Sequence, residues 1–213
     1  MKNILLLCLS LSALVACNNS STEVLPSVSP NEESKVSQEN KSADSTNKTP
    51  QDAFWANLEK HCGKSYAGRF DAEPIPEDFE GKEMKMYVMQ CSEDEIKVPF
   101  YVGDDRSRTW VFTRTDSGIE LKHDHRLEDG SHDEVTMYGG TTINTGLDYV
   151  QFFPADQETS ILIPDASGNM WWVTIDDREY TYNLKRVNTP NHFRVVFDLT
   201  KEIETPEKPW GHE

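Results

Sequence analysis

LKHDHRLEDGSHDEVTMYGG, residues 121–140, contains three of the six histidines of the chain and a turn signal between them. Asp129-Gly130 favours a two-residue hairpin turn, because a type I′ turn requires positive φ at both central residues. We therefore predict a β-hairpin over residues 119–138 whose two strands belong to a larger antiparallel sheet.

The position of this turn sets the register of the predicted hairpin. It places Leu127 opposite His132, His125 opposite Glu134, and His123 opposite Thr136. Successive side chains of a strand point to opposite faces of the sheet, so one face collects the polar groups among apolar residues. The candidate ligand-binding residues on that face are His123, His125, His132, Glu134 and Tyr138. A slip of one residue would move half of them to the other face.

Imidazole and carboxylate groups suggest a metal ion, because zinc binds nitrogen and oxygen ligands. His123 and His125 project from one side of a strand, roughly 7 Å apart, and a metal can bridge that spacing. His123, His125 and His132 are therefore a candidate zinc site, with Glu134 as the base of a metal-dependent hydrolase. Two alternatives stay open: a metal-free pocket for a polar ligand, and a polar hairpin tip in solvent.

Short strands separated by turn residues are predicted for most of the chain around this hairpin. Thr49 and Pro50 begin an amphipathic helix that ends at Gly63. Beyond Gly63 the apolar residues alternate, and about eight to ten strands follow, one of them at residues 159–163. We predict a mostly β fold, in which a short N-terminal helix precedes an antiparallel up-and-down barrel; a β-sandwich is the alternative.

A helix with aromatic residues, a first strand preceded by glycine and then a meander resemble the lipocalin or calycin arrangement. Lipocalins place Gly-x-Trp at the first strand, whereas this chain has Gly63-Lys64-Ser65-Tyr66 there and carries Trp55 in the helix. The resemblance also implies a late arginine that covers the tryptophan, and Arg186 or Arg194 is the candidate. It implies a small-ligand site inside the barrel.

The N-terminus has the pattern of a secretory signal: Lys2, then an apolar run over residues 4–16, then Cys17. The run is shorter than the roughly 20 residues that a spanning helix needs. Leu14-Val15-Ala16-Cys17 resembles the lipobox of bacterial lipoproteins. The resemblance implies that Cys17 is acylated and anchors the chain to a membrane, and Asn18 resembles the pattern for outer-membrane sorting.

The remaining segments follow from composition. Residues 18–48 are polar and lack aromatic residues, which indicates a disordered tether. Residues 49–200 suit a single β-rich domain, and residues 201–213 form an irregular tail in which Trp210 can dock. With Cys8 removed and Cys17 acylated, Cys62 and Cys91 are expected to pair as a disulfide in an oxidising compartment.

A formal net charge of −16 argues against nucleic acid as a partner. No Gly-x-Ser-x-Gly or phosphate-loop motif is present, and we read no complete catalytic constellation. The favoured function is a membrane-anchored periplasmic lipoprotein with a ligand-binding barrel. The alternatives are the metal-dependent hydrolase and an acidic interaction or inhibitor module with a basic protein partner.

Overall fold

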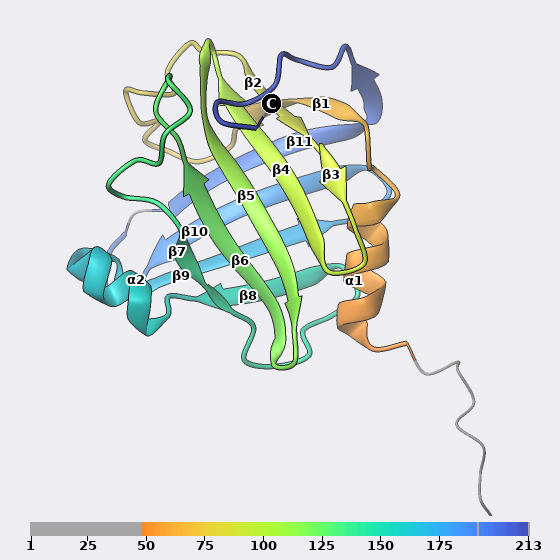
Figure 1. Cartoon of the computed structure of the whole chain (residues 1–213), viewed down its shortest axis with the longest axis vertical. Coiled ribbons are helices and arrows are strands. Elements are labelled where there is room, and N and C mark those ends of the chain that lie inside the picture. Colours follow the sequence, from red (N-terminus) through yellow and green to blue (C-terminus); the bar gives the residue numbers. More distant parts are fainter. Residues whose placement is uncertain (1–47, 191, 213) are drawn as a thin grey trace, which may run out of the picture. The chain divides into compact units, whose positions relative to one another are not determined.

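The computed structural model describes residues 48–190 and 192–212 (Figure 1). The predicted signal segment, its lipobox and almost all of the predicted tether lie outside the described residues. Within the described part, neither helix is both long and apolar enough to cross a bilayer.

A single antiparallel sheet forms nearly all of the domain, as a barrel that is almost closed (Figure 1). In chain order its strands are β1 (Ser65–Phe70), β2 (Met84–Tyr87), β3 (Gln90–Cys91), β4 (Glu95–Val102), β5 (Asp105–Thr115), β6 (Gly118–His125), β7 (Tyr138–Thr141), β8 (Val150–Pro154), β9 (Asn169–Ile175), β10 (Glu179–Arg186) and β11 (His192–Ile203). The sheet order is β7-β6-β5-β4-β2-β1-β11-β10-β9-β8, with β3 beside β4. The predicted barrel is confirmed.

The barrel has a seam, where its two edge strands β7 and β8 meet without forming a ladder. This seam lies in mid-sequence, because the first strand, β1, pairs with the last, β11. The amide of Asp156 donates to the carbonyl of Gly139 across the seam, at 3.0 Å. A Cβ at Gly140 would collide with the carbonyl oxygen of Pro154. Glycine is therefore required where the two edges meet.

Helix α2 (Gln157–Leu162) and the 3-10 turn η1 (Pro164–Ala166) follow β8, so the predicted strand at residues 159–163 is wrong. The carboxylate of Asp156 accepts from the amide of Thr159 at 2.7 Å and caps the helix. The buried hydroxyl of Thr159 then bonds both the amide and the carbonyl of Gly139. Helix α2 thus covers the unpaired edge of β7.

Helix α1 (Pro50–Glu59) begins with the predicted cap, in which the side chains and backbone amides of Thr49 and Asp52 bond reciprocally. Its buried residues, Phe54, Trp55 and Leu58, join the barrel core. Arg114 of β5, rather than Arg186 or Arg194, covers the Trp55 ring at 4.7 Å and binds Asp52 at 2.6 Å. Helix α1 closes one end of the barrel.

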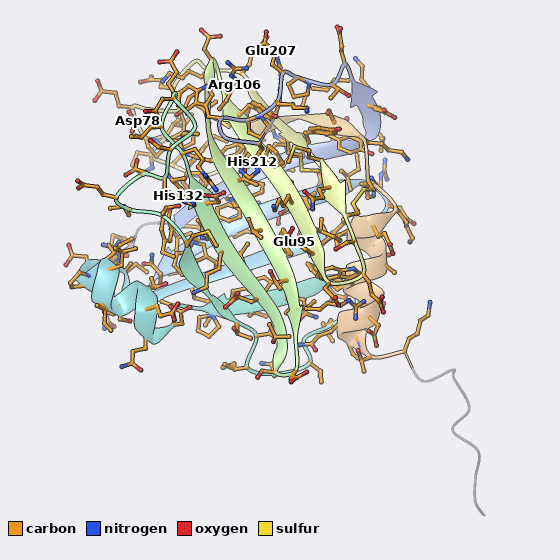
Figure 2. All side chains as sticks on the ribbon, in the orientation of Figure 1. Asp78, Glu95, Arg106, His132, Glu207 and His212 are labelled. Atoms are coloured by element: carbon orange, nitrogen blue, oxygen red, sulfur yellow. A yellow bond between two sulfur atoms is a disulfide. The ribbon has the colours of Figure 1, made fainter. Side chains whose placement is uncertain are left out.

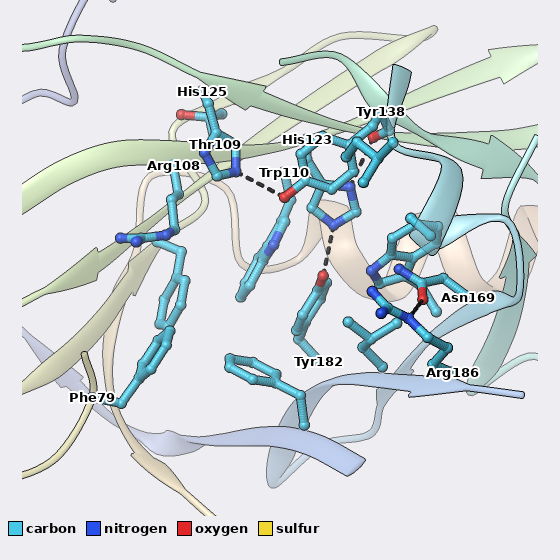
Figure 3. A pocket seen from close by; sticks show the side chains of 16 residues that line it. Phe79, Arg108, Thr109, Trp110, His123, His125, Tyr138, Asn169, Tyr182 and Arg186 are labelled. Carbon is cyan, nitrogen blue, oxygen red and sulfur yellow. Dashed lines mark hydrogen bonds between the residues drawn. The ribbon is translucent and has the colours of Figure 1, made fainter. Parts of the chain in front are cut away.

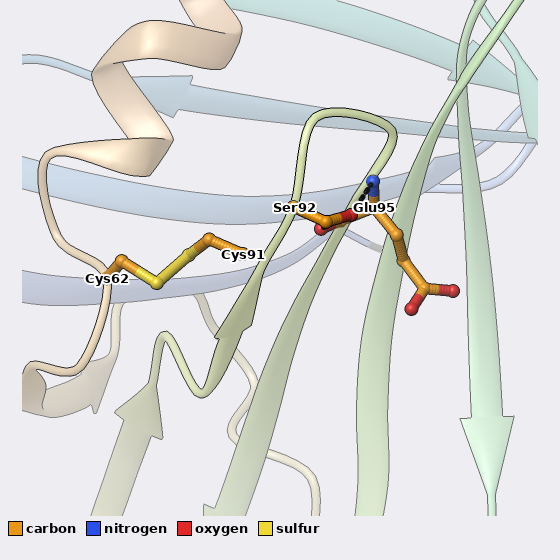
Figure 4. Close-up of a disulfide and its surroundings, with 4 residues drawn as sticks. All are labelled: Cys62, Cys91, Ser92 and Glu95. Atoms are coloured by element: carbon orange, nitrogen blue, oxygen red, sulfur yellow. Dashed lines mark hydrogen bonds between the residues drawn. A yellow bond between two sulfur atoms is a disulfide. The ribbon is translucent and has the colours of Figure 1, made fainter.

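The disulfide between Cys62 and Cys91 is formed, as predicted (Figure 4). It joins the turn after α1 to β3, with a Cα–Cα distance of 6.2 Å. Closing a loop of this length contributes about 3–4 kcal/mol in the chain-entropy model. The bond therefore fixes the terminal helix on the sheet.

Candidate functional site

A cavity of about 280 Å³ lies inside the barrel beside η1, and its lining contains no residue of α1 (Figure 3). Its wall comes from β4, β5, β6, β7, β9, β10, β11 and η1, together with Phe79 of the loop before β2. The aromatic residues in its wall are Phe79, Phe100, Trp110, Tyr138, Trp171, Tyr182 and Phe193. The cavity is therefore a mostly apolar site with a few placed polar groups, which is the usual composition of a small-molecule site.

His123, in β6, is buried in the wall of this cavity, and both of its ring nitrogens are bonded. Nδ1 lies 2.9 Å from the carbonyl oxygen of Tyr138, and Nε2 lies 2.6 Å from the hydroxyl of Tyr182. Because a carbonyl can only accept, Nδ1 carries the proton and Nε2 accepts from Tyr182. Burial lowers the pKa of His123 to about 3, so the ring is neutral at pH 7.

A second histidine–tyrosine pair lies beside the first. The hydroxyl of Tyr138 is 3.0 Å from Nε2 of His125, and the Tyr138 ring stacks on His123 with 4.7 Å between centroids. Burial, and then the charge of Arg108, lower the pKa of His125. Burial raises the pKa of Tyr138 to about 12. The two pairs therefore carry hydrogen-bonding groups without charge at neutral pH.

Three aromatic rings in the wall of the cavity stack on one another in a column. Phe100 stacks on Trp110 at 4.9 Å between centroids, and Trp110 stacks on Tyr182 at 4.4 Å, with interplanar angles of 14° and 13°. Phe100 and Trp110 come from the consecutive strands β4 and β5, and Tyr182 comes from the distant strand β10. Such a column is rigid and apolar, and an aromatic ligand can pack against the ring edges that line the cavity.

Two arginines supply the full charges of the lining. Arg108 forms an ion pair with Asp105 and lies over the Phe79 ring at 5.9 Å. Arg186 donates from Nε to the side-chain oxygen of Asn169 at 3.0 Å. Among the described residues no Asp or Glu lines the cavity.

The hairpin turn differs from the predicted one by a residue. The amide of Gly130 donates to the carbonyl of Leu127, and Gly130 has φ of 84°, so the glycine follows the turn as a bulge. Arg126 consequently pairs with His132, whereas β7 pairs Tyr138 with His123. The predicted register, with His132 opposite Leu127 and Thr136 opposite His123, is wrong.

This register places the predicted residues on two sides of β6. His123, His125 and Tyr138 meet in the cavity, whereas His132 and Glu134 are exposed outside it. His132 lies 3.5 Å from Asp124, whose side chain points away from the cavity. The three-histidine set proposed for zinc is therefore not assembled, and the described residues contain no group of three or more His, Cys, Asp or Glu suited to a metal ion.

Asp124 is the centre of a separate polar cluster on the outer face of the barrel. Figure 2 labels two of its neighbours, His132 and His212. Its carboxylate accepts from Arg126 at 2.9 Å and lies 3.1 Å from Nε2 of His212 in the C-terminal tail. Burial acts to raise the pKa of Asp124, but the bonds from His212 and Arg126 lower it further than burial raises it. Arg106 pairs with Glu207, so the tail is held across the outer strands at two points.

Sequence reasoning missed the far wall of the cavity. Tyr182, Trp110 and Arg186 stand in β10 and β5, and a pattern in one strand does not show which distant strand will face it. The alternation in these strands identified inward positions but did not order the strands around the barrel.

Comparison of the chain with protein-family models, with curated proteins and with solved structures gives no match.

Proposed function

We propose that the barrel is a binding domain for one small, flat ligand. The observation that carries this proposal is the cavity of about 280 Å³, walled by aromatic rings and two neutral histidine–tyrosine pairs. Its volume of about 280 Å³ is just below the range of known ligand sites, which is roughly 300–1,000 Å³. The ligand is accordingly the size of one or two rings.

The state of the histidines supports binding in preference to acid–base catalysis. His123 has both nitrogens engaged, and its pKa of about 3 leaves it unprotonated at neutral pH. A general base works best when its pKa is near the operating pH. The pairs instead provide hydroxyl groups that orient a ligand.

A pocket-filling variant tests this proposal. Leu184 lines the cavity, whereas Val187 is 60% exposed nearby in the chain, so Leu184→Trp fills the site and Val187→Trp is its matched control. Ligand-observed NMR with indole, benzamide and benzoate should show binding to the wild type and to Val187→Trp, and its loss in Leu184→Trp. Equal binding to both variants would show that the compounds occupy another place.

We further propose that Cys17 anchors this domain to a bacterial envelope membrane, with the domain in the periplasm. The lipobox-like Leu14–Cys17 segment supports the anchor, and the Cys62–Cys91 disulfide is consistent with an oxidising compartment. Palmitate labelling in a bacterial host should mark the full chain and Cys8→Ser but not Cys17→Ser. Label retained by Cys17→Ser would refute the anchor.

A further inference from the structure

The charge of the cavity is opposite to the charge of the chain. The sequence has 37 acidic against 21 basic side chains, yet the cavity lining includes two arginines and no acid among the described residues. Both lining histidines are neutral because burial lowers their pKa values. In a site walled by aromatic rings, an arginine acts through a lower dielectric than at the surface.

Arg186 is held in place without being neutralised. It pairs in register with Asn169 of the neighbouring strand, and the amide oxygen of that buried residue accepts from Nε. No carboxylate of the described residues lies within 4.0 Å of the guanidinium, and no other hydrogen bond joins this side chain to the described part of the chain. The remaining guanidinium N–H groups are available to an acceptor in the cavity.

Arg108 differs from Arg186 in this respect. The carboxylate of Asp105 already binds Arg108, so its charge is offset within the protein. The two arginines come from β5 and β10, and Figure 3 shows them on different sides of the cavity. A single anionic group therefore has one preferred anchor, which is Arg186.

We propose that the ligand of this cavity is a small aromatic carboxylate, with its ring among the aromatic side chains of the lining and its carboxylate on Arg186. This inference rests on the proposed binding function and adds the charge of the ligand. A guanidinium binds a carboxylate through two parallel hydrogen bonds, which fixes the orientation of a flat acid. The neutral tyrosine hydroxyls supply further polar contacts for ring substituents.

Three small aromatic probes separate the effect of charge from that of the ring: benzoate, the neutral benzamide of the same shape, and the cationic benzylamine. Chemical-shift titrations of ¹⁵N-labelled protein should give benzoate at least a tenfold lower Kd than benzamide, because hydrogen bonds to a charged group exceed neutral ones by about this factor. Benzylamine should bind most weakly. Equal Kd values for benzoate and benzamide would overturn the inference.

Variants of the arginines test whether Arg186 causes the preference for benzoate over benzamide. Arg186→Gln should remove the preference for benzoate while keeping benzamide binding, and Arg186→Lys should restore part of it. Arg108→Gln should keep most of the preference, and Arg178→Gln, an exposed arginine away from the cavity, should keep all of it. A full preference retained in Arg186→Gln would refute the assignment.

The outcomes also separate this inference from the proposed function. Binding of benzamide without any advantage for benzoate refutes the anion alone and leaves the pocket proposal standing. Failure of all three probes to bind the wild type refutes the pocket proposal, and the inference with it.

Discussion

The inner and outer faces of β6 carry alternate residues of one short sequence. The ionisable groups are neutral on the inner face and charged on the outer face. On the inner face, burial among rings lowers the pKa of His123 and His125 and keeps both neutral. On the outer face, Asp124 is ionised because His212 and Arg126 bond it. Lys122, for which burial acts to lower the pKa, has a raised pKa because Asp156 and Glu158 bond it. Burial alone does not decide charge; the partners at each face do.

The largest expected difference between the two faces of β6 is in how much their packing contributes to the free energy of unfolding. Leu121 is fully buried on the inner face, and Leu121→Ala should lower the free energy of unfolding by about 3 kcal/mol, because it removes apolar contacts and leaves a cavity. Lys122→Met, its neighbour on the outer face, should cost less, because methionine keeps the apolar stem. Urea unfolding of both variants measures this, and a larger loss for Lys122→Met would contradict the comparison.

Acidification should destabilise the protein through His123. Its folded pKa is about 3 and its ordinary value is 6.5, so the unfolded chain binds more protons between these values and stability falls as the pH falls. The contribution between pH 6.5 and 5 is about 2 kcal/mol. Unfolding free energies measured across this range should fall less steeply in His123→Gln, which cannot titrate. The same slope in both proteins would contradict a buried neutral ring.

On the outer face, the free energy of unfolding should depend on pH in the way that an ionised, hydrogen-bonded carboxylate causes. Asp124→Asn should lower the free energy of unfolding at pH 7 by about 1–2 kcal/mol, because it removes a charge bonded to Arg126 and His212. The pKa of Asp124 is lowered from 3.8, so the stabilisation is complete above pH 4 and is lost as the pH falls further. Thermal unfolding at pH 7 and pH 3 should therefore show a smaller difference at pH 3. Glu134→Gln, an exposed neighbour, is the control.

Removal of residues 204–213 should have the smallest effect on the cavity. The tail bonds outer-face groups, through Glu207 to Arg106 and through His212 to Asp124, so its loss should cost about 1 kcal/mol of stability. Benzoate affinity should stay within twofold, because the lining contains no tail residue. A large loss of affinity with an unchanged fold would show that the outer face reaches the site.

Much of the fold was predictable because its signals are local. Alternating apolar residues after Gly63 indicated strands, and Thr49, Pro50 and Asp52 indicated the helix cap, all of which the structure contains. The strand predicted at residues 159–163 is wrong, because this segment lies in helix α2 and the turn after it. The N-cap residue of that helix, Asp156, can be recognised in the sequence. Asp156 precedes Thr159 by three residues, the spacing at which a capping carboxylate meets a helix amide.

The site was only partly predictable, because register and strand order are tertiary properties. His123, His125 and Tyr138 were placed together from alternation, and the structure brings them together. His132 was misplaced because Gly130 adopts the bulge position, which shifts the pairing so that Arg126 lies opposite His132. The register changes again before β7, where Met137 has a positive φ, and Tyr138 therefore lies on the cavity face. Tyr182 was not found, and Arg186 was named only as a candidate to cover a tryptophan, since only barrel closure brings β10 opposite β6.

The central claim is that the ligand chemistry of this chain lies on the inner face of β6. Long-range ¹H–¹⁵N spectra of the histidine rings, recorded while benzoate is added, test it most directly. We predict that His123 has its proton on Nδ1, that the His123 and His125 signals shift with benzoate, and that those of His132 and His212 do not. Shifts confined to His132 and His212, or a His123 ring protonated at neutral pH, would contradict the account.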